Sequence, residues 1–327
     1  MTTTSTTTPA AVPILARPLS TSRVMLWLAV AAVVLALVPL VLPGYQVSIV
    51  TQILIFSILA MSIDILAGFA GRTSLGHGAI FGISTYVVIY FTANLGGSLW
   101  VALLLGILAA TALAAVFAIF AIRTSGVYFL LLTLALGMIV WGVCLRWTSV
   151  TGGENGLRGA GRPAFLGDHV SFYYAVLIVV LPITFAMWRF VNSPFGLSLR
   201  GLRDSESRMR SLGYNVSLHL FIAFMVSGFF AGIAGALYAM FNDFVSPSTV
   251  QLSQSVAGLL MAITGGVGTL FGSFVGAAAI ILLENVVSVF TARWPTVLGL
   301  TFILIMIFAP EGIVGRVRIL LARRRRS

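Results

Sequence analysis

The run SLWVALLLGILAATALAAVFAIFA, residues 98–121, decides the fold class, because it is long, apolar and free of charged side chains. Roughly 20 apolar residues in a helix cross the hydrocarbon core of a bilayer. Lipid offers no hydrogen-bond partners, so the backbone of such a run must satisfy its own peptide groups within a helix. A transmembrane β-barrel would show alternating segments of about ten residues, and this run does not alternate. We therefore predict a membrane-spanning helix here.

Similar runs recur along the whole chain. Of its 327 residues, 59% are hydrophobic and 8% are charged, and the mean hydropathy is +1.09. Soluble domains carry about 25% charged residues, and none could bury this much apolar surface. We expect an all-α, polytopic integral membrane helical bundle with about ten transmembrane helices. They cover residues 24–43, 47–67, 75–95, 98–121, 126–147, 170–191, 218–241, 252–266, 273–290 and 294–310.

The eighth of these segments, 252–266, differs from the others because glycines interrupt its end. Gly265, Gly266, Gly268 and Gly272 lie there, and a re-entrant hairpin fits this pattern as well as a crossing helix does. Eight spans are therefore the alternative to ten.

The arginines predict how the bundle is oriented. With a cytoplasmic N-terminus and ten spans, both termini are cytoplasmic, and only Arg146, Arg158, Arg162 and Arg293 of the 19 basic residues fall outside. Such an excess of positive charge is typical of the cytoplasmic side. We further expect residues 1–23 to be a disordered Thr/Pro-rich cytoplasmic tail, 24–315 a single transmembrane domain and 316–327 a basic tail. Its Arg323–Arg326 cluster is interpreted as a topological anchor, and the alternative is attraction to anionic membrane lipid, worth about 1 kcal/mol per residue.

Residue types missing from the sequence exclude several chemistries. Every basic residue is arginine, so the chain has neither the lysine of a phosphate-binding P-loop nor one that forms a Schiff base. Cys144 is the single cysteine, and no HExxH or GxSxG motif occurs. We expect no enzyme activity, no cofactor and no metal. The net charge of +11 does not indicate nucleic-acid binding, because the arginines cluster at the ends of apolar segments.

The long basic connection 192–219 contains SPFGLSLRGLRDSESRMRSLGYNV. Pro194 and Gly196 are helix breakers. A short helix is expected after them, and Gly213 is suited to end it. Its apolar residues are Leu199, Leu202, Met209 and Leu212. The pattern favours an amphipathic helix beside the membrane or in a partner's groove, and a solvated basic loop is the alternative.

Two glycine-rich breaks are candidates for a transport pathway. The first, GFAGRTSLGHG at 68–78, offers Gly71, Ser74 and His77, and Thr73 or Ser74 is expected to cap the following helix. We interpret His77 as a hydrogen-bonded structural residue. The second, GGVGTLFG at 265–272, offers Gly265, Gly266 and Gly268, either on a pathway or in close helix packing.

Charged residues inside apolar segments invite a functional reading because they are costly in lipid. Asp64 is expected near the end of its helix, reaching Arg72 or the interface, and Glu284 lies deeper beside Asn285. Two isolated carboxylates support a proton relay only weakly. The external connection TGGENGLRG, residues 151–159, carries Glu154, Asn155 and Arg158, either to contact a protein partner or as a solvated turn.

Five segments in order resemble the LivM-type permeases of branched-chain amino-acid ABC importers, from about residue 47 to 315. They are GFAGRTSLGHGAIFGISTY, GVYFLLLTLALGMIVWGVCLRWTSVTGGENGL, SPFGLSLRGLRDSESRMRSLGYNV, MAITGGVGTLFGSFVGAAAIILLEN and FAPEGIVG. The resemblance implies a permease in the bacterial inner membrane that moves leucine, isoleucine and valine by alternating access. Its implied partners are two cytoplasmic ABC ATPase subunits, a second, LivH-type permease and an external substrate-binding protein.

The resemblance also implies that the 192–219 connection holds the coupling helix that docks on an ATPase subunit. The residues implied are Arg200, Arg203, Asp204, Glu206, Arg208 and Gly213. A related importer for urea, short amides or another small solute is the first alternative. An ion-coupled secondary transporter is the second, and it would need no docking helix.

Overall fold

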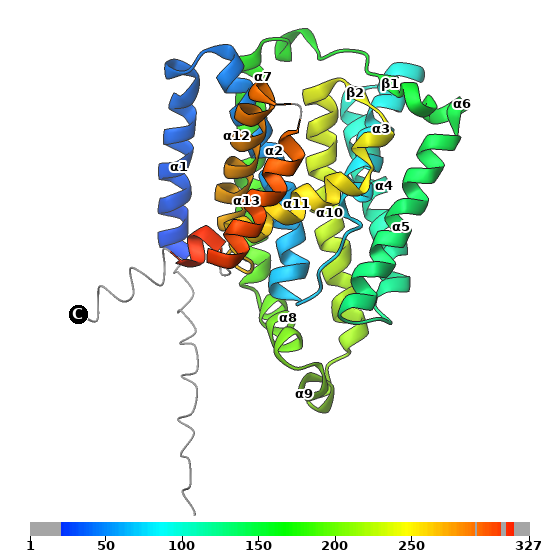
Figure 1. Cartoon of the computed structure of the whole chain (residues 1–327), viewed down its shortest axis with the longest axis vertical. Helices are drawn as coiled ribbons and strands as arrows, with labels where there is room; N and C mark the ends of the chain where they lie inside the picture. Colours follow the sequence, from blue (N-terminus) through cyan, green and yellow to red (C-terminus); the bar gives the residue numbers. More distant parts are fainter. Residues whose placement is uncertain (1–20, 292, 309–311, 317–327) are drawn as a thin grey trace, which may run out of the picture.

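The structure, a computed structural model, describes residues 21–291, 293–308 and 312–316 (Figure 1). It is an all-α polytopic membrane protein, as predicted, and each of the ten predicted segments contains a helix. These helices are α1 (Thr21–Val41), α2 (Gly44–Asp64), α3 (His77–Asn94), α4 (Leu99–Ala121), α5 (Val127–Arg146), α7 (His169–Val191), α10 (Val216–Asn242), α11 (Leu252–Gly265), α12 (Gly272–Phe290) and α13 (Trp294–Phe308). The predictions for residues 1–20, 309–310 and Arg323–Arg326 lie outside the described residues.

Six helices of the described chain are long and apolar enough to cross a membrane. They are α2 with its continuation to Phe69, α4, α5, α7, α10 and α12. α11 has 14 residues, which gives a helix about 21 Å long, shorter than a hydrocarbon core of about 30 Å. Ten crossings therefore stay a prediction.

The centre of the bundle is built on α2, α3 and α10, and α10 also packs along α4. Small residues allow the close approach of α4 and α10. The buried face of α4 carries Ala110 and Ala114, and β-carbons on Gly228 and Gly232 of α10 would collide with them. Close backbone contact of this kind is how helices associate in lipid, where burial of apolar side chains gives no driving force.

The two ends of the bundle differ in structure (Figure 1). α8 (Pro194–Asp204) and α9 (Glu206–Ser211) form one end, called here the α8–α9 end. The opposite end carries α6 (Thr148–Thr151), the 3-10 turns Gly153–Asn155, Ala164–Leu166 and Pro247–Thr249, and the strands β1 (Leu157–Arg158) and β2 (Phe244–Val245). The strands pair antiparallel, with Leu157 opposite Val245. Sequence reasoning missed this ladder, because two residues per strand leave no periodic pattern.

α11 lies across the middle of the bundle rather than along its length (Figure 1). Its first turn meets the first turn of α3, where the Gly78 N–H donates to Ser255 Oγ at 2.8 Å. A glycine-rich turn then returns the chain into α12, and the two helices pack closely as a hairpin. The glycines of the second predicted break thus form the tip of this hairpin.

Candidate functional site

The 192–219 connection forms two helices where one was expected. The Ser193 hydroxyl accepts from the Gly196 N–H at 3.2 Å, and Pro194 occupies the first turn of α8, where its missing N–H costs nothing. The short helix therefore begins at Pro194 rather than after Gly196 as expected, and the break in the chain lies at Asn192 and Ser193, between α7 and α8. Ser205 then ends α8 and caps α9, accepting from the Arg208 N–H at 3.4 Å. Gly213 follows α9 with a φ of 86°, the conformation expected of a helix-ending glycine.

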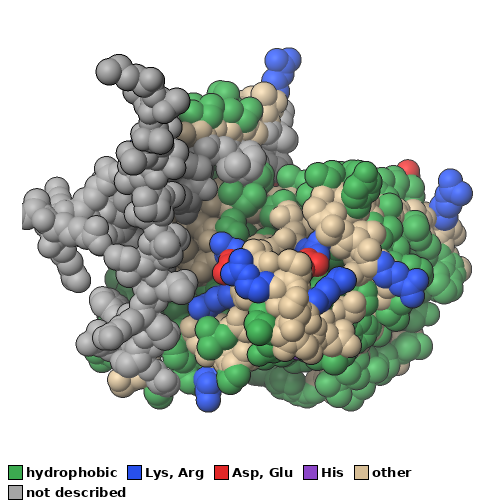
Figure 2. All heavy atoms as spheres, turned by 90° about the horizontal axis from the view of Figure 1, so that it is seen from below, with side chains coloured by type: hydrophobic (Ala, Val, Ile, Leu, Met, Phe, Trp, Pro, Cys, Tyr) green, Lys and Arg blue, Asp and Glu red, His purple; other side chains and the backbone are tan. Residues whose placement is uncertain are grey.

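The apolar face of α8 and α9 packs against the chain itself. Leu199, Leu202 and Met209 are buried, whereas Leu212 is 68% exposed. The polar face is left for solvent or a partner, and it carries Asp204, Arg208 and Arg210. Figure 2 looks onto this end and shows arginine side chains gathered there with few acidic ones. The predicted amphipathic character is confirmed, but its apolar side is already occupied.

Three charged side chains of α8 and α9 hold the segment that follows α2. Arg203 Nη1 donates to the Gly68 carbonyl, although the Arg203 side chain remains partly exposed. Glu206 pairs with the buried Arg72, and the Arg200 guanidinium lies 5.0 Å from the centre of the Phe69 ring. Burial, and then the neighbouring Arg203 charge, lower the pKa of Arg200. We call Gly68–Arg72 together with Arg200, Arg203 and Glu206 the junction.

The backbone at the junction is irregular, as the glycines predicted. Residues Ile65–Phe69 form a π-helical turn, closed by the Ala70 N–H donating to the Ile65 carbonyl at 3.2 Å. Such turns inside α-helices occur frequently at functional sites. Gly71 then adopts a φ of 69°, and a β-carbon there would lie 2.8 Å from Arg203 Cγ. The junction therefore requires glycine both for its backbone conformation and for the approach of α8.

Asp64 does not reach Arg72 or the interface, and that prediction is wrong. Its carboxylate is fully buried and accepts from the Gly268 N–H at 2.6 Å and the Leu270 N–H at 3.0 Å. Arg72 is instead taken by Glu206, which the sequence places 134 positions away. The two glycine-rich breaks are neighbours, because a β-carbon on Gly68 would overlap the backbone of Gly268.

His77 is a buried, hydrogen-bonded residue, as predicted. Its Nε2 lies 2.7 Å from Ser227 Oγ, which in turn donates to the Ser62 carbonyl at 2.5 Å. No group of three or more metal-ligating side chains occurs among the described residues. The expectation that Thr73 or Ser74 caps α3 is wrong: the N-cap is Gly76, and Ser74 Oγ accepts from the Gly76 N–H at 3.2 Å, before the helix begins.

Glu284 lies on α12, apart from the junction and partly buried. It is close enough to Tyr238 of α10 for an electrostatic interaction, and no cation pairs with it within the described chain. Its neighbour Asn285 accepts from the Tyr45 hydroxyl at 3.5 Å. In the described part of the chain no hydrogen bond links Glu284 to Asp64. The structure therefore gives no support to a proton relay between these two carboxylates.

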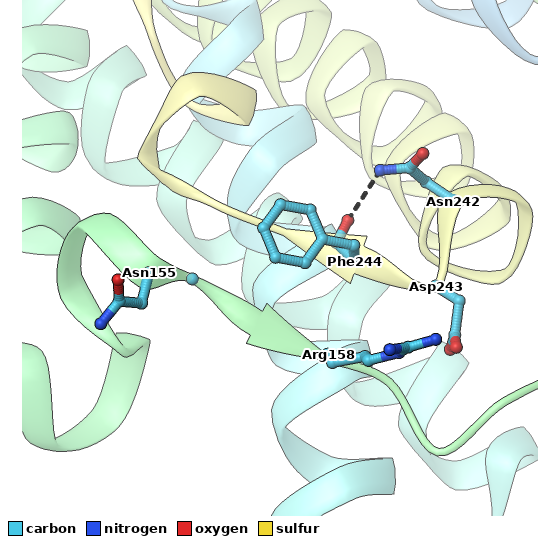
Figure 3. A pocket seen from close by; sticks show the side chains of 6 residues that line it. Asn155, Arg158, Asn242, Asp243 and Phe244 are labelled. Atoms are coloured by element: carbon cyan, nitrogen blue, oxygen red, sulfur yellow. Dashed lines mark hydrogen bonds between the residues drawn. The ribbon is translucent and has the colours of Figure 1, made fainter.

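The opposite end holds a surface pocket of about 460 Å³ (Figure 3). Asn155 and Arg158 of the predicted external loop line it, with Asn242, Asp243 and Phe244 from the end of α10 and β2. In Figure 3 the Arg158 side chain points toward Asp243. Glu154 is exposed on the neighbouring 3-10 turn and does not line the pocket.

Arg162 fastens this loop and was missed by sequence reasoning. It donates to the carbonyls of Met240 at 2.7 Å and Phe241 at 2.6 Å, and its guanidinium lies 4.1 Å from the centre of the Phe172 ring. A cation at the carboxyl end of α10 is favourable to the helix dipole. Burial lowers the pKa of Arg162, and the nearby Asp243 opposes that shift. In the sequence, the only signal for this role of Arg162 is that it is one of four arginines expected on the external side.

Comparison with known proteins gives a consistent result. Residues 45–310 match the family described as branched-chain amino acid transport system / permease component. The chain is 28% identical over 327 residues to the high-affinity branched-chain amino acid transport system permease protein LivM of Salmonella typhimurium, covering 91% of this chain and 77% of the relative. The LivM protein of Escherichia coli strain K12 is 28% identical over 318 residues, with coverages of 88% and 75%. No solved structure matches the chain.

Proposed function

This chain belongs to the branched-chain amino acid transport permease family, and from that premise we propose that it is the membrane-spanning subunit of an ABC importer for leucine, isoleucine and valine. ATP is hydrolysed by two separate cytoplasmic subunits, because the sequence has no lysine with which to build a phosphate-binding loop. A LivH-type permease completes the transmembrane pair, and an external binding protein delivers the solute.

The junction is the observation that carries this proposal. α8 and α9 present a polar, arginine-rich face outward and hold the end of α2 from within through Arg203 and Glu206. Such a helix pair suits a surface that receives force from a partner and passes it to a transmembrane helix. Alternating access then follows from rocking of rigid helix groups around a central path.

Orientation and location complete the proposal. The arginine excess supports an orientation with the α8–α9 end in the cytoplasm, and the family supports a location in the inner membrane of a bacterium. The pocket beside Arg158 then faces outward, where a binding protein would meet Asn155 and Arg158. The chain itself contributes no catalytic step.

Reconstitution tests the proposal. The permease pair is placed in vesicles with and without the ATPase subunits and the loaded binding protein, and uptake of radiolabelled leucine is compared with that of urea. We expect leucine uptake only when ATP, the ATPase subunits and the binding protein are all present. Uptake that persists without the ATPase subunits would favour an ion-coupled transporter, and preferential uptake of urea would reassign the solute.

A further inference from the structure

We infer that Asp64 is a positioning residue for coupling: it ties the turn between α11 and α12 to the end of α2 that α8 holds, so that movement of α8 reaches α11 in the middle of the bundle. This inference rests on the proposed function, since it concerns how a movement imposed by the ATPase subunits is passed on.

The turn between α11 and α12 is shaped around the Asp64 carboxylate. Gly268 has a φ of 79° and Leu270 a φ of 47°, so both residues are left-handed, which is uncommon for leucine. In this arrangement the N–H groups of Gly268 and Leu270 point the same way, onto the two carboxylate oxygens at 2.6 and 3.0 Å. Backbone concavities of this kind bind anions. A fully buried carboxylate in a transmembrane helix is costly, and here two charge-assisted hydrogen bonds offset the cost.

The same turn touches the coupling helix. Arg203 Nη1 donates to the carbonyl of Gly68, one helical turn beyond Asp64. A β-carbon on Gly268 would lie 3.4 Å from that same nitrogen. A β-carbon on Gly68 would overlap both Asp64 Oδ1 and the Gly268 backbone. Backbone therefore meets backbone between Gly68 and Gly268, and the Arg203 side chain is the link that joins α8 to this contact.

The hairpin carries such a displacement away from the junction as one unit. Gly265 packs on the backbone of Gly272, and Gly276 packs on the Met261 carbonyl, so α11 and α12 are in direct backbone contact. At its far end α11 contacts α3, where Ser255 Oγ accepts from the Gly78 N–H. A shift of the α11–α12 turn would therefore move the contact between the first turns of α3 and α11, inside the bundle. Broken helices of this kind surround transport pathways.

The test uses the assembled complex of the permease pair, ATPase subunits and binding protein. Asp64→Asn preserves size, but its amide nitrogen cannot accept the second backbone N–H. We expect ATP hydrolysis to continue while the solute moved per ATP falls about tenfold, the size of a typical coupling between sites. Val267→Ala is the matched control, because Val267 lies in the same turn with its side chain 43% exposed.

A second readout separates coupling from simple stabilisation. In the unsubstituted complex, nucleotide binding should change hydrogen exchange of the amides in residues 266–270, and Arg203→Gln should abolish that response while Arg203→Lys partly retains it. The two Arg203 variants still test the inference if the complex with Asp64→Asn fails to assemble.

Two results would overturn the inference: an unchanged ratio of solute to ATP in Asp64→Asn, or a nucleotide response in residues 266–270 that survives Arg203→Gln. Absence of ATP-driven uptake in the unsubstituted complex would overturn the proposed function, and this inference with it.

Discussion

Arg72 and Glu206, 134 positions apart in the chain, form an ion pair that joins the segment after α2 to α9. The Arg72 side chain is 6% exposed and that of Glu206 is 35% exposed. Removal of one partner from a largely buried pair leaves the other charge uncompensated. The pair therefore links the position of α9 to the state of the first glycine-rich break.

Reversal of this pair gives the first prediction. Glu206→Arg should destabilise the protein by about 1–3 kcal/mol, because Arg72 then faces a like charge, and Arg72→Glu added to it should recover part of the loss. Thermal unfolding in detergent measures both. Asp204→Arg is the control, since Asp204 is exposed and forms no ion pair within the described chain. An equal loss in the control would refute a specific role for the pair.

Orientation is tested by cysteine labelling in intact cells. Cys144 is buried and should react slowly, so it can remain in place. Leu212→Cys lies at the α8–α9 end and Phe165→Cys at the opposite end, and the native side chains are 68% and 64% exposed. A membrane-impermeant maleimide should label Phe165→Cys in intact cells and Leu212→Cys only after the membrane is opened. Labelling of Leu212→Cys in intact cells would contradict the predicted orientation and indicate the opposite one.

Docking should depend on the outward charge of α9. Arg208→Glu and Arg210→Glu should slow the association of the ATPase subunits and change its salt dependence, because charges at the rim of an interface act mainly on encounter. Arg123→Glu is the matched control: Arg123 is exposed but belongs to the α4–α5 connection. Association rates of the ATPase subunits, measured at two salt concentrations, would show whether substitutions on α9 slow association more than the control does. Equal slowing by all three substitutions would argue against docking at α9.

Gly68 should tolerate no side chain. A β-carbon at this position overlaps Asp64 Oδ1 and the Gly268 backbone, so Gly68→Ala should cost about 1–3 kcal/mol of stability as an overpacked site. Gly142→Ala on α5 meets nothing within 4 Å and should be neutral. Unfolding midpoints of the two variants provide the comparison, and indistinguishable midpoints would contradict the close contact.

Arg162 should not be replaceable by lysine. Its guanidinium donates to two carbonyls at the end of α10 and stacks on Phe172, whereas an ammonium group cannot reproduce that planar fork. Arg162→Lys should lower stability by about 1–2 kcal/mol. Arg158→Lys, on the exposed β1 strand, should have little effect. A stable Arg162→Lys variant would show that charge alone holds the loop.

The glycine-rich breaks show where sequence reasoning succeeded. GFAGRTSLGHG and GGVGTLFG are visible as interruptions in apolar runs, and both became irregular backbone, at Ile65–Phe69 and at the tip of the α11–α12 hairpin. Their meeting at Gly68 and Gly268 was not visible, because these glycines lie 200 positions apart in segments that share no pattern. The same holds for Asp64, whose partners are backbone N–H groups that any residue could supply.

The order of residue types predicts the class of protein and the approximate positions of the ten apolar helices, whereas α6 and the division between α8 and α9 were not predicted. The class and these positions follow from local physics: apolar runs enter lipid, lipid leaves the backbone no partner except itself, and glycine, proline and serine set where helices start and stop. Packing between distant segments pairs Glu206 with Arg72 and seats the Asp64 carboxylate on the α11–α12 turn. These contacts depend on which helices pack side by side. The close fit of small residues across the whole bundle selects the neighbouring helices, and no single segment carries that information.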